Sequence, residues 1–135
     1  PVVALAAWSM IMWLWLYITR IPAMKKAGID AGKMVGGTGN KLDGVLPDKT
    51  QWVAHNYNHL MEQPTVFYAT AIALALMGQG HGLNTTLAWG YVIFRVLHSI
   101  VQATWNKVVV RFALFSVASL CLIALVLHAA IAAFH

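Results

Sequence analysis

Apolar residues dominate four long stretches of the chain, and shorter polar segments separate these stretches from one another. The stretches cover residues 2–22, 50–77, 83–106 and 108–134. Each is about 20 residues long or longer, which is the length that an α-helix needs to cross the hydrocarbon core of a bilayer. Pro22 ends the first stretch, and a glycine-rich turn at residues 78–82 follows the second. The pattern predicts an all-α integral membrane protein, a single four-helix bundle.

The composition supports this class. Of the 135 residues, 60% are hydrophobic and only 10% are charged, whereas an average soluble domain carries about 25% charged residues. The net charge of +5 does not indicate a nucleic-acid partner, because the lysines gather beside the first predicted span. The single cysteine, Cys121, cannot form a disulfide within the chain.

The lysines are confined to the connections at one end of the predicted bundle. The first loop, residues 23–50, and the third connection contain Lys25, Lys26, Lys33, Lys41, Lys49, Lys107 and Arg111. The turn at residues 78–82 has no lysine or arginine. Because loops rich in lysine and arginine remain in the cytoplasm, we expect the first loop there and both termini on the opposite side.

Two polar stripes interrupt the apolar pattern. One consists of Tyr91, Arg95, His98 and Gln102, and the other of His55, Asn58, His59 and Glu62. The steps of three and four residues put each stripe on one face of a helix. A charged side chain inside a membrane is costly, so it faces the bundle interior or a wet cavity and commonly marks a functional site. The stripes therefore predict a site for a small polar ligand.

The depths of two charged residues predict an ion pair. Glu62 and Arg95 each lie about 11 residues, or roughly 16 Å, from the cytoplasmic end of their spans. Arg20 and Arg111 lie nearer that surface. Together with Arg95 they make the expected polar cavity, open to the cytoplasm, mainly cationic. Such a cavity suits an anion with planar carboxylates. An arginine beside a thiol also favours the thiolate. We expect no metal site, because His55, His59 and Glu62 do not have the spacing of a zinc motif.

Two interpretations of these stripes remain open. The polar residues either form a ligand site, or they hold helices together through a purely structural pair between Glu62 and Arg95. The second interpretation corresponds to a non-enzymatic protein, either a small transporter or an assembly partner.

Three segments in this part of the chain resemble the MAPEG family, the membrane-associated proteins in eicosanoid and glutathione metabolism. They are NHLMEQPTVFY at 58–68, FRVLHS at 94–99 and NKVVVRF at 106–112. The resemblance implies a homotrimer with glutathione as co-substrate, held between neighbouring protomers near the cytoplasmic side. It also implies a bacterial-type member, located in the bacterial inner membrane.

The resemblance also implies roles for individual residues. Arg111 matches the arginine that stabilises the glutathione thiolate, and Glu62 matches a glutamate that contacts glutathione. Eukaryotic members have an arginine and an asparagine just ahead of this glutamate, where this chain has Asn58 and His59, and several members have a tyrosine at the position of Gln102. The candidate binding residues are Arg20, Asn58, His59, Glu62, Tyr91, Arg95, His98 and Gln102, with Arg111 as the catalytic residue.

The expected function is that of a membrane-bound glutathione-dependent transferase or peroxidase. Its second substrate is expected to be a small lipophilic electrophile or a lipid hydroperoxide that enters the site from the lipid.

Overall fold

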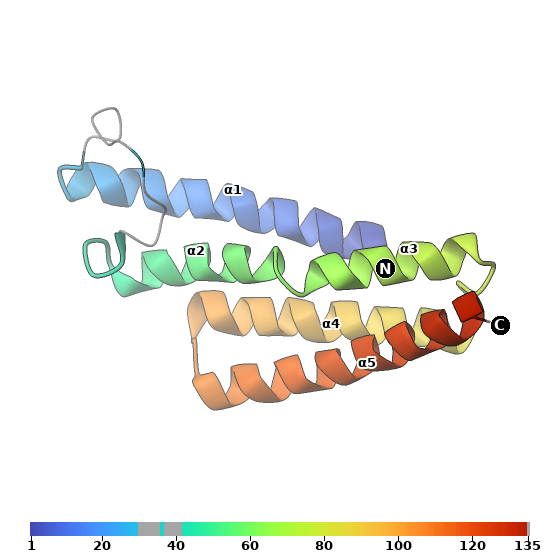
Figure 1. The fold of residues 1–135 in the computed structure, drawn as a ribbon. Helices are drawn as coiled ribbons and strands as arrows, with labels where there is room; N and C mark the ends of the chain where they lie inside the picture. Colours follow the sequence, from blue (N-terminus) through green and yellow to red (C-terminus); the bar gives the residue numbers. More distant parts are fainter. Residues whose placement is uncertain (30–35, 37–41, 135) are drawn as a thin grey trace.

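Five α-helices build the part of the chain that the computed structural model describes, which comprises residues 1–29, 36 and 42–134. They are α1 (Val2–Lys26), α2 (Asp48–Leu60), α3 (Pro64–Leu76), α4 (Leu83–Thr104) and α5 (Val108–Phe134). The described residues contain no strand, so the all-α prediction is confirmed for them. Figure 1 shows α2 and α3 lying end to end, so that the helices form a bundle of four long rods.

The rods alternate in direction along the chain. The first residue, the turn between α3 and α4, and the end of α5 lie at one end of the bundle (Figure 1). The end of α1, the start of α2 and the connection from α4 to α5 lie at the other end. The basic residues Lys25, Lys26, Lys49 and Lys107 therefore share this second end. Lys33 and Lys41, on which the charge argument also rests, lie outside the described residues.

Two of the described helices, α1 and α5, are long and apolar enough to cross a membrane. Many of their large apolar side chains are exposed, for example Ile18, Phe112 and Leu120. The first helix continues to Lys26 although we predicted its end at Pro22. Proline removes one backbone hydrogen bond, but the basic residues of the last turn interact favourably with the helix dipole.

The second predicted span is broken into two helices, whereas we predicted one uninterrupted helix over residues 50–77. The first helix, α2, ends at Leu60, and α3 begins at Pro64. A proline at this position has no N–H to donate, and its ring would clash with the carbonyl of Leu60 in a continuous helix. It is well suited to the first turn of a new helix instead.

The side chain of Gln63 joins the break to the neighbouring helices. Tyr91 Oη of α4 donates to Gln63 Oε1 at 3.1 Å, and Gln63 Nε2 donates to Ser119 Oγ of α5 at 3.1 Å. Beside it, the rings of Phe67 and Tyr91 stack with their centroids 4.5 Å apart. The amide thus fixes the start of α3 against both partners.

Close packing of α4 on α5 depends on a small residue. A Cβ atom at Gly90 would lie 3.3 Å from Cys121 Sγ, closer than ordinary van der Waals contact. The main apolar core lies beside this contact and includes Leu5, Leu74 and Leu125. Together these contacts hold α4, which carries one of the polar stripes, against α5.

We predict that Gln63→Leu destabilises the protein by about 2 kcal/mol, because two interhelical hydrogen bonds at about 1 kcal/mol each are lost. Thermal unfolding in detergent measures the change. The matched control is Gln79→Leu in the exposed turn after α3, where the side chain makes no interhelical bond to a described residue. Equal unfolding midpoints for Gln63→Leu and the wild type would contradict this assignment.

Candidate functional site

Arg95 forms the centre of a buried polar cluster between α2 and α4. Its side chain has no exposed surface. Nη1 lies 3.3 Å from His98 Nδ1, and Nη2 lies 3.0 Å from His59 Nδ1 and 3.4 Å from the carbonyl oxygen of His59. A guanidinium group only donates, so both Nδ1 atoms act as acceptors, and each neutral ring carries its proton on Nε2. The two rings thus replace a carboxylate as partners of the arginine.

Aromatic packing closes this cluster on the side of α5. The rings of His59 and His98 stack with centroids 4.9 Å apart. The ring of Phe115 lies 5.3 Å from the first and 5.9 Å from the second, and its centroid is 5.6 Å from Arg95 Cζ. Sequence reasoning missed Phe115, although it lies one helical turn after Arg111 on the same face of α5. Arg111 interacts electrostatically with both histidines.

The predicted ion pair between Glu62 and Arg95 is not formed. Among the described residues, the only contact within 4.0 Å between a basic side chain and a carboxylate joins His55 to Asp43. Glu62 is exposed in the turn after Leu60. The expected pairing required a continuous helix through this position, but the helix is broken between Leu60 and Pro64 and leaves the carboxylate exposed. Glu62 retains only a longer-range electrostatic interaction with Arg95.

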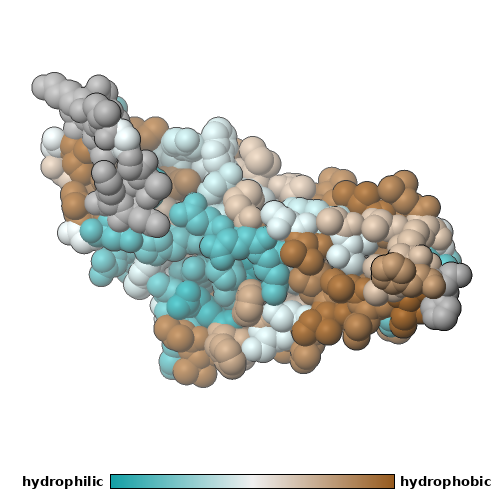
Figure 2. Space-filling model, viewed as in Figure 1, coloured by the Kyte–Doolittle hydropathy of each residue, from teal (hydrophilic) through white to brown (hydrophobic). Residues whose placement is uncertain are grey.

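The whole predicted stripe of α4 is buried: its exposed fractions are 0% for Tyr91 and Arg95, 4% for His98 and 5% for Gln102. The stripe of α2 is more open, because Asn58 is exposed and His59 is half-buried. Figure 2 shows hydrophilic residues over the half of the visible face that contains α2, and hydrophobic residues over the half that contains α3.

Several buried polar atoms have no hydrogen-bond partner among the described residues. They include Arg20 Nε, Arg95 Nε, Arg111 Nε, Gln102 Oε1 and both amide atoms of Asn56. Leaving such atoms without partners costs free energy, so a ligand or a second protein surface that supplied acceptors to the arginines would be stabilised. Asn56, only 1% exposed, was not among the predicted site residues, because it lies outside the stripe of α2.

A second polar network contains Arg20 and lies nearer the basic end of the bundle, where α1 ends and α2 begins. Arg20 Nη2 donates to Gln51 Oε1 at 3.2 Å, and Gln51 Nε2 donates to Asp43 Oδ1 at 2.6 Å. His55 Nε2 reaches the same oxygen at 3.0 Å. The hydrogen bonds from Gln51 and then from His55 hold the pKa of Asp43 below its ordinary value. Gln51 precedes His55 by one helical turn, and this spacing is the signal that could have identified it.

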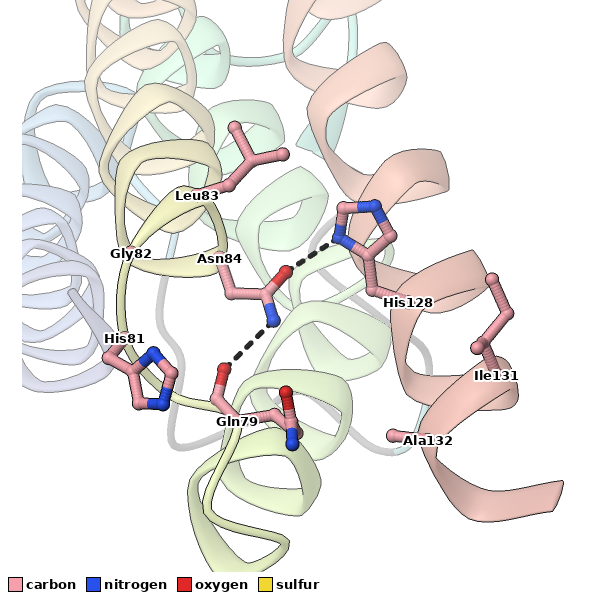
Figure 3. Close-up of a pocket in the computed structure, with 8 residues that line it drawn as sticks. All are labelled: Gln79, His81, Gly82, Leu83, Asn84, His128, Ile131 and Ala132. Carbon is pink, nitrogen blue, oxygen red and sulfur yellow. Dashed lines mark hydrogen bonds between the residues drawn. The ribbon is translucent and has the colours of Figure 1, made fainter. Parts of the chain in front are cut away.

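The opposite end of the bundle has a hollow of about 500 Å³ of different chemistry (Figure 3). Asn84 connects its walls: His128 Nδ1 lies 2.6 Å from Asn84 Oδ1, and Asn84 Nδ2 donates to the carbonyl oxygen of Gln79 at 2.8 Å. The described residues that line it include no arginine, lysine, aspartate or glutamate. These contacts tie the turn before α4 to α5. The described lining thus differs from the polar cluster of Arg95, His59, His98 and Phe115, the arginine cluster.

Comparison with family models identifies a match to the MAPEG family over residues 1–131. Curated proteins and solved structures give no match to the chain. The family match covers nearly the whole sequence, including α2, α4 and the start of α5, which supply the arginine cluster. The predicted family resemblance is therefore confirmed: the chain belongs to the MAPEG family, a family of membrane proteins.

Proposed function

We propose that this protein is a membrane-bound glutathione-dependent transferase or peroxidase. Its second substrates are small lipophilic electrophiles or lipid hydroperoxides that reach the site from the bilayer. The observation that carries the proposal is the set of three arginines, each with a buried Nε atom that no described residue satisfies. A tripeptide with two carboxylates and a thiol supplies acceptors for such a set.

The open polar face of α2 supports an oligomeric site. Asn58 and Glu62 are exposed in the single chain, and Glu62 lies in the break of the second rod. In a membrane, irregular backbone and charged side chains are stable only against protein or a water-filled cavity. We propose a homotrimer in which a neighbouring protomer covers this face and glutathione lies between the two. The basic end of the bundle faces the cytoplasm, and the bacterial inner membrane is the proposed location.

The side chains of this site have different roles in the proposed function. Arg95 is held by two neutral histidines, so its charge is not cancelled and attracts a ligand carboxylate. Glu62 has no ion-pair partner among the described residues, so its carboxylate is available for the amino group of glutathione. Tyr91 and Gln102 line the same face of α4, and Asn58 and Arg20 contribute further hydrogen-bonding groups at the edge of the site.

Arg111 stabilises the glutathione thiolate in this proposal. For conjugation, the thiolate sulfur forms a bond to the electrophilic carbon while the leaving group departs with its electron pair. For peroxide reduction, the sulfur attacks the terminal peroxide oxygen and the O–O bond breaks, which gives a sulfenic acid and, after protonation, the alcohol. A second glutathione then forms the disulfide and releases water. Desolvation around α5 strengthens the charge interaction on which either route depends.

The alternative of a non-enzymatic transporter or assembly protein rested on a structural pair between Glu62 and Arg95. The structure does not contain this pair, and the histidines that replace it leave the arginine charge uncompensated. The observations therefore favour the ligand site.

We predict that Arg111→Ala abolishes the thiolate absorbance of bound glutathione, since a shift of two pKa units in the thiol requires about 2.7 kcal/mol from such a group. Calorimetry on the purified protein in detergent, combined with ultraviolet difference spectra, measures binding and thiolate formation separately. Lys107→Ala, which removes a neighbouring charge, is the control and should leave both unchanged. No binding to the wild type at millimolar glutathione would overturn glutathione as the thiol.

We predict a mass of three chains for the protein in mild detergent, because a neighbouring protomer would cover the polar face of α2 and the family resemblance implies three protomers. Native mass spectrometry measures the stoichiometry directly. Glutathione binding by a stable monomer would contradict the placement of the site between protomers.

A further inference from the structure

Asp43, in the segment just before α2, connects two side chains of that helix through one oxygen atom. Its Oδ1 accepts from Gln51 Nε2 at 2.6 Å and from His55 Nε2 at 3.0 Å. About half of the Asp43 side-chain surface is exposed, so the group lies at the mouth of the bundle and not in its core. Neither Asp43 nor Gln51 belongs to the arginine cluster around Arg95.

The carboxylate fixes the orientation of the Gln51 amide. An ionised carboxylate only accepts hydrogen bonds, so Gln51 must turn its NH₂ group toward Asp43. The carbonyl end of the same amide then points to Arg20, whose Nη2 donates to it at 3.2 Å. Without Asp43, the amide could flip and present donors to a guanidinium that only donates. Asp43 therefore favours the amide orientation in which Gln51 Oε1 accepts from Arg20.

Arg20 retains donors for a ligand in this arrangement. One of its five N–H groups is used by Gln51, and its Nε is buried without a partner among the described residues. The remaining N–H groups of the planar guanidinium are suited to a carboxylate. Asp43 also interacts electrostatically with Arg20 without making a direct ion pair with it.

We propose that Asp43 is a positioning residue for the anion-binding guanidinium of Arg20 and acts on it through the oriented amide of Gln51. This inference rests on the proposed function, because the anion concerned is a carboxylate of the bound thiol peptide. His55, the other group bonded to the carboxylate, holds Asp43 against α2.

The test compares glutathione binding by the full-length protein in detergent for Asp43→Ala, Asp43→Asn and the wild type. Asp43→Ala is expected to raise the Kd about tenfold, equivalent to the loss of one well-placed contact. The thiolate absorbance per bound glutathione stays unchanged, because Arg111 is not involved. Asparagine keeps an acceptor oxygen for both bonds, so Asp43→Asn restores the Kd to within about twofold of the wild-type value.

Asp48→Ala is the matched control, since it removes an exposed carboxylate from the first turn of α2 that makes no side-chain hydrogen bond to a described residue. It should change the Kd by less than about twofold. The double variant Asp43→Ala with Gln51→Leu should bind as weakly as either single variant, because the two residues act in series. Equal weakening by Asp48→Ala, or additive effects in the double variant, would overturn the positioning role.

A readout without ligand separates this inference from the proposed function. The side-chain ¹⁵N resonances of Arg20, assigned by their loss in Arg20→Lys, should shift in Asp43→Ala and not in Asp48→Ala. If the wild type does not bind glutathione, the proposed function fails while this spectrum still reports on the positioning. Unchanged Arg20 resonances in Asp43→Ala would overturn the inference itself.

The same network predicts a pH dependence. The pKa of Asp43 lies below the ordinary 3.8, with the hydrogen bond from Gln51 as the largest cause. A lowered pKa means that the stabilisation is complete above the ordinary value and is lost as the pH falls through the lowered one. Carboxyl ¹³C titration should give a midpoint below 3.8 for Asp43, and Gln51→Leu should move it toward 3.8. A wild-type midpoint at or above 3.8 would contradict the network.

Discussion

The burial of one guanidinium group without a carboxylate partner is the constraint around which this bundle is organised. Arg95 has no exposed surface, and its charge is accommodated by two histidine nitrogens, a backbone carbonyl and the face of Phe115. Neutral acceptors solvate a cation without cancelling its charge, whereas a carboxylate would do both. The cluster can therefore be buried while Arg95 keeps its positive charge. Three helices, α2, α4 and α5, must be in register for it to form.

The break before Pro64 explains why the partner is not Glu62. A continuous helix would have carried Glu62 along α2 toward the depth of Arg95, but the proline ends α2 at Leu60 and leaves the glutamate in an exposed turn. The side chain of Gln63 then secures the break by bonding to α4 and α5. The proline thus keeps the Glu62 carboxylate apart from the Arg95 guanidinium within the bundle.

The sequence was sufficient for the parts of the structure that depend on periodicity. Apolar stretches predicted the four rods, and steps of three and four residues predicted that Tyr91, Arg95, His98 and Gln102 share a face, which the structure buries. Spacing could not predict what crosses between helices. The contacts of His59 with Arg95 and of Asp43 with Gln51 join residues that are far apart or lie in irregular segments. The depth estimated for Glu62 was also misleading, because the estimate assumed an uninterrupted helix.

In the proposed function, arginines from α1, α4 and α5 converge on a thiol peptide held between protomers. The most direct test is an electron cryomicroscopy structure of the protein in lipid nanodiscs with glutathione. We expect a trimer with the glutathione sulfur within hydrogen-bonding distance of Arg111, and with its carboxylates near Arg20 and Arg95. A structure in which Glu62 of one protomer neutralises an arginine of its neighbour, with no glutathione at the interface, would contradict it.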